Sequence, residues 1–177
     1  MWIAKIRFSE EGTLMGPKAE KHGVNLLVLL LSFFKEKDWI IVNVTGTING
    51  CPESKADFFK DLETEERIIN LEIKGDFFVG TIREPIFADQ IYDKNVFYLE
   101  PAFISGEGYE VITLGSYSRE KLVRIFEVLK DNLDGELVFI ENRKIGDLSI
   151  IRANPELTSK QKEAMELAIR EGYYKFP

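Results

Sequence analysis

The chain has 177 residues, of which 45% are hydrophobic and 13 are phenylalanine, a composition that can fill a sizeable core and argues against intrinsic disorder. Its net charge of −7 repels phosphate and argues against nucleic-acid binding by this acidic body itself. Cys51 is the single cysteine, so an internal disulfide is excluded and a reducing, cytoplasmic location is expected. Abundant charged residues with only two glutamines are typical of thermophile proteins.

The first predicted elements are a strand, a loop and a buried helix. Residues 2–8 alternate between apolar and polar side chains, which predicts a half-buried strand. Residues 9–23 contain three glycines and a proline and are expected to form a loop. Residues 24–36 are predicted as a buried helix, because their apolar run is shorter than the roughly 20 residues that a membrane-spanning helix needs.

The next segment is predicted to be a strand, a short helix and a hairpin. Residues 39–48 are rich in β-branched side chains, which favour a strand, and a short helix is expected over 53–62. Strands over 67–74 and 77–83 are separated by Gly75 and Asp76, which is hairpin spacing.

The second half repeats this kind of alternation. Strands are predicted over 96–104 and 109–114, followed by a helix that Ser118 would cap through its hydroxyl. An apolar stripe at helical spacing defines the inner face of that helix, formed by Leu122, Ile125, Phe126 and Leu129. Two further strands are expected over 137–140 and 148–151.

Together these elements predict an α+β fold with antiparallel-rich sheets covered by helices on one face. Our preferred version has two ferredoxin-like (ACT-like) units, 1–94 and 95–153, followed by a separate C-terminal segment, 154–177. No residue-level repeat relates the two halves, so their duplication is a topological hypothesis.

The C-terminal segment carries a sharp helix signature. Thr158 and Gln161 have capping-box spacing, in which each side chain accepts from the other residue's backbone N–H. A helix is expected over 159–171, and Gly172 lies where a helix C-terminus favours a left-handed residue. The aromatic residues that follow would expose apolar surface that is normally buried against a partner element: Tyr173, Tyr174 and Phe176.

This segment resembles the opening helix of the DNA-binding domain in archaeal helix-turn-helix transcription regulators of the bacterio-opsin-activator type. The resemblance covers about twenty residues and rests on Leu157, Thr158, Gln161, Ala168, Gly172, Tyr173, Tyr174 and Pro177. The stretch 108–129 more loosely resembles the end of the sensor region in such proteins.

The resemblance implies a regulatory region of a DNA-binding transcription regulator. The family places its recognition helix beyond the position of Pro177, so DNA contact is expected only through a downstream segment. A homodimer and a small-molecule effector are expected, with no membrane partner. The alternative is a stand-alone α+β protein that binds a small metabolite without DNA.

The sequence points to no residue for catalysis, metal binding or cofactor binding. His22 and Cys51 are too few for a zinc site, and an enzyme is not expected because no paired acid/base motif or phosphate loop is present. The acidic run at Glu63, Glu65 and Glu66 is interpreted as a solvated face, and Gly106-Glu107-Gly108 as a turn. Core packing is favoured over a ligand pocket for the frequent aromatic residues, namely Phe58, Phe59, Phe77, Phe78, Phe87, Tyr92, Phe97, Tyr98 and Phe103.

Overall fold

The computed structural model describes residues 1–9, 11–144 and 158–170. The chain divides into two compact units, Met1–Ile145 and Gly146–Pro177, each considered by itself below. The strands are β1 (Trp2–Ser9), β2 (Asn25–Glu36), β3 (Trp39–Asn49), β4 (Ile68–Lys74), β5 (Phe77–Pro85), β6 (Val96–Tyr98), β7 (Ala102–Ser105), β8 (Tyr109–Ser116) and β9 (Glu136–Asn142). The helices are α1 (Gly16–His22), α2 (Pro52–Glu63), the 3-10 helix η1 (Ile86–Gln90), α3 (Arg119–Leu133) and α4 (Ser159–Arg170).

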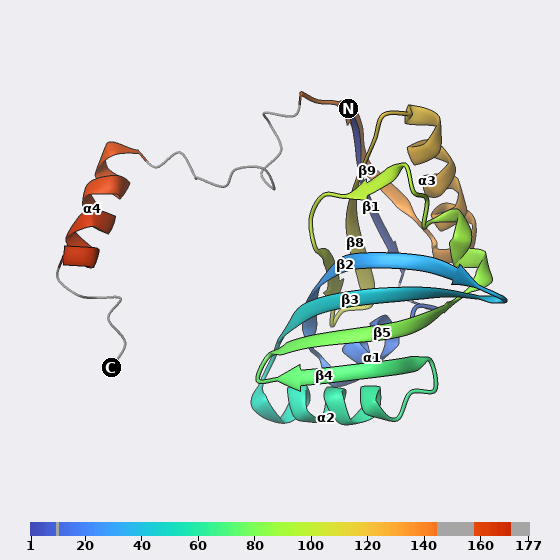
Figure 1. Cartoon of the computed structure of the whole chain (residues 1–177), viewed down its shortest axis with the longest axis horizontal. Helices are drawn as coiled ribbons and strands as arrows, with labels where there is room; N and C mark the ends of the chain where they lie inside the picture. The colour runs from blue at the N-terminus through green and yellow to red at the C-terminus, as the bar shows by residue number, and fades with distance from the viewer. Residues whose placement is uncertain (10, 145–157, 171–177) are drawn as a thin grey trace. The chain divides into compact units, whose positions relative to one another are not determined.

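The first unit is built on one nine-stranded sheet in which the described pairings are antiparallel. The strand order is β4-β5-β3-β2-β7-β8-β1-β9, and β6 pairs additionally with β8. Figure 1 shows β2, β3, β5 and β4 running steeply across the direction of β8, β1 and β9. The short strand β7 joins these two groups, since it pairs with β2 on one side and β8 on the other.

Each group of strands contains one crossover helix. Strand β5 pairs antiparallel with both β3 and β4, so β3 and β4 are parallel and α2 connects them. Strand β1 lies in the same way between β8 and β9, and α3 connects those two strands. Both groups therefore have a split β-α-β arrangement, in which a third strand lies between the two parallel strands. This middle strand is β5, which follows α2 and β4 in the chain, in one group, and β1, the first strand of the chain, in the other. The α+β class and the antiparallel-rich sheet are confirmed, whereas ferredoxin-like units are not.

Two clusters of buried apolar side chains form the core on one face of the sheet. The first joins α1 and α2 to β2, β3, β5 and β7, with Phe58 and Phe78 at its centre. The second joins α3 to β1, β6 and β8, with Leu114 and Leu122 fully buried. Strands from both sides of the expected boundary between residues 94 and 95 thus contribute to a single sheet.

Most predicted elements are confirmed. The strands expected over 2–8, 39–48 and 109–114 are β1, β3 and β8, and the hairpin around Gly75 and Asp76 is β4–β5. The predicted helix stripe of α3 is buried at Leu122, Ile125 and Leu129. Ser118 precedes α3, but its hydroxyl donates to Glu120 instead of accepting from the helix backbone.

The helix predicted over 24–36 is wrong, because these residues form strand β2. A short apolar run fits a buried strand as well as a buried helix, and pairing partners decide between them. Here β3 pairs along the whole of β2, and β7 pairs with Leu26, Leu27 and Val28. Within this part of β2, Leu26 and Val28 are buried and Leu27 is exposed, which is the period of a strand.

Two other expectations also need correction. Helix α1 lies within the loop predicted over 9–23, with Pro17 in its first turn and Gly23 as a left-handed C-cap. The strand predicted over 96–104 is two strands, β6 and β7, with Pro101 between them. The strand predicted over 148–151 lies outside the described residues.

In the second unit, helix α4 and its capping box are confirmed. The Gln161 backbone N–H donates to Thr158 Oγ1 at 3.3 Å, and the Thr158 backbone N–H donates to Gln161 Oε1 at 2.9 Å. Ala168 is half-buried in this helix. Gly172, Tyr173 and Tyr174 lie outside the described residues, as does Phe176.

Candidate functional site

A cavity of about 120 Å³ lies where the two core clusters meet. Its walls are mostly apolar and come from both clusters: Phe8, Leu14, Met15, Val28, Leu30, Val42, Val44, Ile82, Ala88, Ile91, Ala102, Ile104, Ile112, Leu129 and Leu133. Gly12 also lines the cavity and is exposed, so the lining reaches the protein surface there. Mostly apolar cavities with a few polar groups are the usual form of small-molecule sites.

Two carboxylates line this cavity, one from each half of the sheet. Glu84 on β5 is paired with Ile40 on β3, which is 1% exposed, so Glu84 occupies a position that points towards the core. Glu110 on β8 is paired with both Phe8 and Ile104, which are also buried. Each carboxylate therefore stands at an inward position that strand alternation would give to an apolar residue.

Burial controls the charge of Glu84. Its side chain is 14% exposed, and the guanidinium Nη1 of Arg67 lies 3.9 Å from its Oε2 atom. Burial raises the pKa of Glu84 to about 7, although the positive charge of Arg67 acts in the opposite direction. Near neutral pH this carboxyl group can therefore be either charged or neutral.

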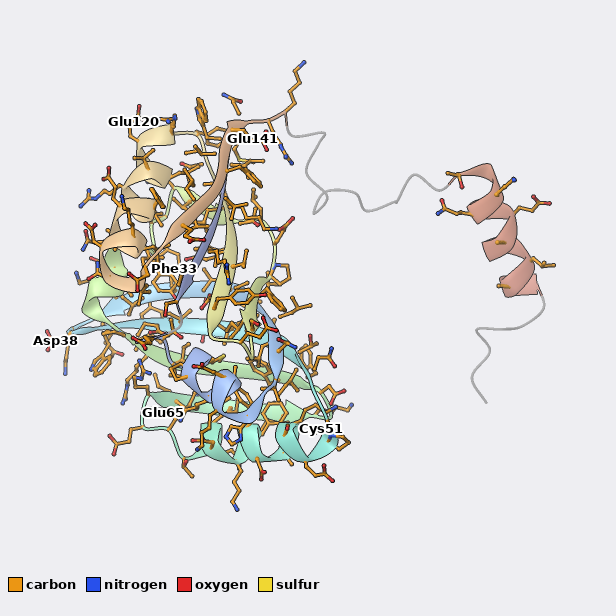
Figure 2. The ribbon with its side chains drawn as sticks, turned by 180° about the vertical axis from the view of Figure 1, so that it is seen from behind. Phe33, Asp38, Cys51, Glu65, Glu120 and Glu141 are labelled. Carbon is orange, nitrogen blue, oxygen red and sulfur yellow. The ribbon has the colours of Figure 1, made fainter. Side chains whose placement is uncertain are left out.

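Arg67 is shared among several acceptors and is not dedicated to Glu84. Its Nη2 donates to the backbone carbonyl of Thr13 at 3.3 Å, and its Nε lies 3.6 Å from Glu65 Oε1. Arg67 and Glu65 are on the segment after α2, and Figure 2 places Glu65 and Cys51 towards opposite ends of that helix. This arrangement leaves the negative charge of Glu84 only partly compensated.

Thr13 and two tyrosines complete the polar part of the lining. The rings of Tyr92 and Tyr98 are stacked with centroids 6.2 Å apart, and the ring of Phe33 lies 5.4 Å from that of Tyr92. Burial, and then the charges of Glu84 and Glu110, raise the pKa of both phenols. The tyrosines therefore stay neutral and offer hydroxyl groups and aromatic faces.

The two residues considered for metal or thiol chemistry are both explained by local structure. His22 Nε2 lies 3.0 Å from Asp61 Oδ2, and Lys18 and Lys21 bind the same carboxylate at 2.9 and 2.6 Å. These contacts tie α1 to α2 and lower the pKa of Asp61 well below its usual range. Cys51 caps α2 by accepting from the Ser54 backbone N–H at 3.4 Å.

The aromatic residues singled out in the sequence divide among several environments. Phe58, Phe59 and Phe78 are buried in the first core cluster, as core packing predicts. Phe77 and Phe97 are exposed, and Phe103 is half-buried. Tyr92 and Tyr98 line the cavity, which matches the alternative of an aromatic-lined pocket.

Sequence reasoning missed Glu84 and Glu110, although a signal for each was present. In β5 the inward residues are Phe78, Gly80 and Ile82, and Glu84 continues that series. In β8, Ile112 and Leu114 continue the inward series that begins at Glu110. A carboxylate in register with buried apolar residues was the available signal, and reading it requires knowing the strand bounds.

Neither protein-family models nor curated protein sequences gave a match. Among the described residues, no cluster of three histidine, cysteine or acidic side chains could hold a metal ion. None of the described helices has the length and apolar character needed to cross a membrane.

Proposed function

We propose that this chain is the effector-binding region of a transcription regulator and that the cavity between the core clusters is its effector site. The observation that carries this proposal is the lining itself, in which Glu84, Tyr92, Tyr98 and Glu110 face mostly apolar walls. Buried titratable groups with shifted pKa values in a cavity are typical of functional sites. A purely structural core would favour apolar residues at these inward positions.

The regulatory part of the proposal rests on helix α4. Its capping box at Thr158 and Gln161 belongs to the sequence pattern that resembles the opening helix of bacterio-opsin-activator-type DNA-binding domains. In this proposal a downstream segment contacts DNA, because the net charge of −7 disfavours contact by the 177 residues of this chain. We further propose a homodimer, because two-fold symmetric regulators match palindromic operators. A cytoplasmic location is proposed because a single cysteine fits a reducing compartment.

The regulatory proposal is tested with the full-length product of the gene. In vitro selection from random duplex DNA should enrich one motif, and the expected motif is a palindrome. Ligands that stabilise the protein in a thermal-shift screen should then change the affinity for the selected DNA, because an effector must bind two states of the regulator unequally. Failure to enrich any motif would overturn the regulatory proposal.

A second candidate function is a stand-alone binding protein for a small metabolite. It is favoured by one observation, namely that the described cavity lining belongs entirely to the first unit, Met1–Ile145. This candidate predicts ligand binding in the thermal-shift screen together with no selected DNA motif. The two measurements therefore separate the two functions.

A further inference from the structure

We propose that the cavity binds a small organic cation, with the positive group beside Glu84 and the apolar body against the surrounding side chains. This inference rests on the proposed effector site and adds the chemical class of its ligand. Three observations lead to it: the charge of the lining, its aromatic faces and its apolar walls.

The first observation is the charge of the lining. Glu84 and Glu110 contribute two carboxylates, whereas no lysine, arginine or histidine is among the described residues that line the cavity. Arg67 lies 3.9 Å from Glu84 and 3.6 Å from Glu65, so its positive charge is shared between these two carboxylates. An anionic ligand would be repelled by this arrangement, and a cationic ligand would be attracted.

The second observation is the pair of aromatic rings in the same lining as the carboxylates, each with one face against the other ring and one face left over. Tyr92 and Tyr98 lie in the same lining, with their rings stacked at 6.2 Å. The face of an aromatic ring attracts a cation electrostatically, and more strongly when water is excluded. Carboxylates and aromatic faces together favour an ammonium group over a neutral polar group.

The third observation is that the rest of the lining is apolar, with walls such as Val28, Val42 and Ile82. Ca²⁺ and Mg²⁺ are surrounded by oxygen atoms from carboxylates, carbonyls and water, and apolar walls supply no such oxygen. An alkyl or aromatic body would bury apolar surface against them, which stabilises the complex by roughly 25 cal/mol per Å². The volume of about 120 Å³ fits a body of about one ring or a short branched chain.

Cation binding should be coupled to release of a proton. Part of the Glu84 population is protonated near pH 7, and the ammonium group binds only the carboxylate form. The proton leaves to the buffer, so the affinity should rise with pH. Between pH 6 and pH 8 the dissociation constant should fall about tenfold, in line with the change in the charged fraction of Glu84.

The test is calorimetric titration of the full chain with matched pairs of probes. Benzylamine, cyclohexylamine and butylamine carry a positive charge between pH 6 and 8, and each is compared with the alcohol of the same carbon skeleton. We expect at least one amine to bind at pH 8 at least tenfold more tightly than its alcohol. Glu84→Gln should abolish this preference and the pH dependence, while the exposed control Glu72→Gln should leave both unchanged.

The outcomes separate the ligand class from the site. If an alcohol binds as tightly as its amine, or if Glu84→Gln keeps the preference, the cationic ligand is overturned while the cavity remains a binding site. If none of the six probes binds, the cationic ligand is overturned, and the effector site itself is then judged by the thermal-shift screen described above.

Discussion

At the scale of single residues, burial of Glu84 makes the stability of the folded protein depend on pH. The pKa of Glu84 is raised from 4.5 to about 7 in the folded protein, so the folded state favours the neutral carboxyl group. The stability that the neutral group provides is fully present below pH 4.5 and is lost as the pH rises through about 7. A shift of this size corresponds to about 3 kcal/mol at pH 8.

Replacing Glu84 with Gln should therefore stabilise the ligand-free protein in a pH-dependent way. Glutamine resembles the neutral acid, so the melting temperature should change little at pH 4.5 and should rise by roughly 5–10 °C at pH 8. Thermal unfolding followed by circular dichroism at both pH values measures the difference. Glu72→Gln on the exposed side of β4 serves as the control and should show no such pH dependence.

The ion pair with Arg67 acts against the effect of burial on Glu84. If Glu84→Gln destabilised the protein at pH 8, the contact with Arg67 would outweigh the effect of burial, and Glu84 would act as a structural ion-pair partner.

Side-chain contacts between residues close in sequence could be predicted, whereas contacts between distant residues could not. The capping box at Thr158 and Gln161 was predictable because it depends on neighbours within one turn. Glu84 and Glu110 were not, since they are far apart in sequence and meet one cavity only after the sheet has formed. The partner of His22, Asp61, lies 39 residues away and could not be identified from the sequence either.

At the scale of elements, β2 and α1 show why local patterns were insufficient. The apolar run in β2 is too short to span a membrane, and that length argument led to the prediction of a buried helix. Its strand form depends on β3 and β7, which are tertiary partners that the run itself does not encode. For α1 the local signals were present, because Pro17 and Gly23 mark a helix start and end, but three glycines favoured a loop.

Strand β3 depends on a glycine at one crowded position. A Cβ atom on Gly46 would lie 2.6 Å from the Leu27 carbonyl oxygen and 2.7 Å from the ring of Phe78, which is fully buried. Both contacts are far closer than van der Waals distance, and one partner is backbone. Gly46 therefore allows β2, β3 and the Phe78 ring to approach closely in the first core cluster.

Gly46→Ala should destabilise the protein by about 1–3 kcal/mol, because the core must shift to admit a methyl group. Chemical denaturation measures the loss. Gly80→Ala on the adjacent strand β5 is the matched control, since its added Cβ would meet its nearest neighbour at 3.3 Å. Equal losses in the two variants would contradict the crowding at Gly46.

At the scale of the whole first unit, the cavity lies where two split β-α-β groups meet. One group orders its middle strand β5 after the crossover helix, and the other takes β1 from the start of the chain. The sequence predicted an alternation of strands and helices in each half. It did not predict that β1, from the start of the chain, lies between β8 and β9 of the second half, because strand order is set by long-range pairing. The cavity lining likewise combines both core clusters and could not be assembled from either half alone.

A larger side chain at Ala102 on strand β7 would fill part of the cavity. Ala102 lines the cavity and lies on the strand that pairs with both groups. In Ala102→Leu the larger side chain would occupy volume that is otherwise available to a ligand. Burying the added carbons should contribute about 1–2 kcal/mol, less any strain from imperfect fit.

Ala102→Leu is therefore expected to keep or raise the melting temperature and to weaken every cavity ligand at least tenfold. Thermal unfolding and calorimetric titration with the best-binding amine measure the two effects. Ala56→Leu, the same substitution at an exposed position of α2, should leave ligand affinity unchanged. If the amine bound Ala102→Leu with undiminished affinity, its site would lie elsewhere on the protein, because the cavity cannot hold both the leucine side chain and the ligand body in the same volume.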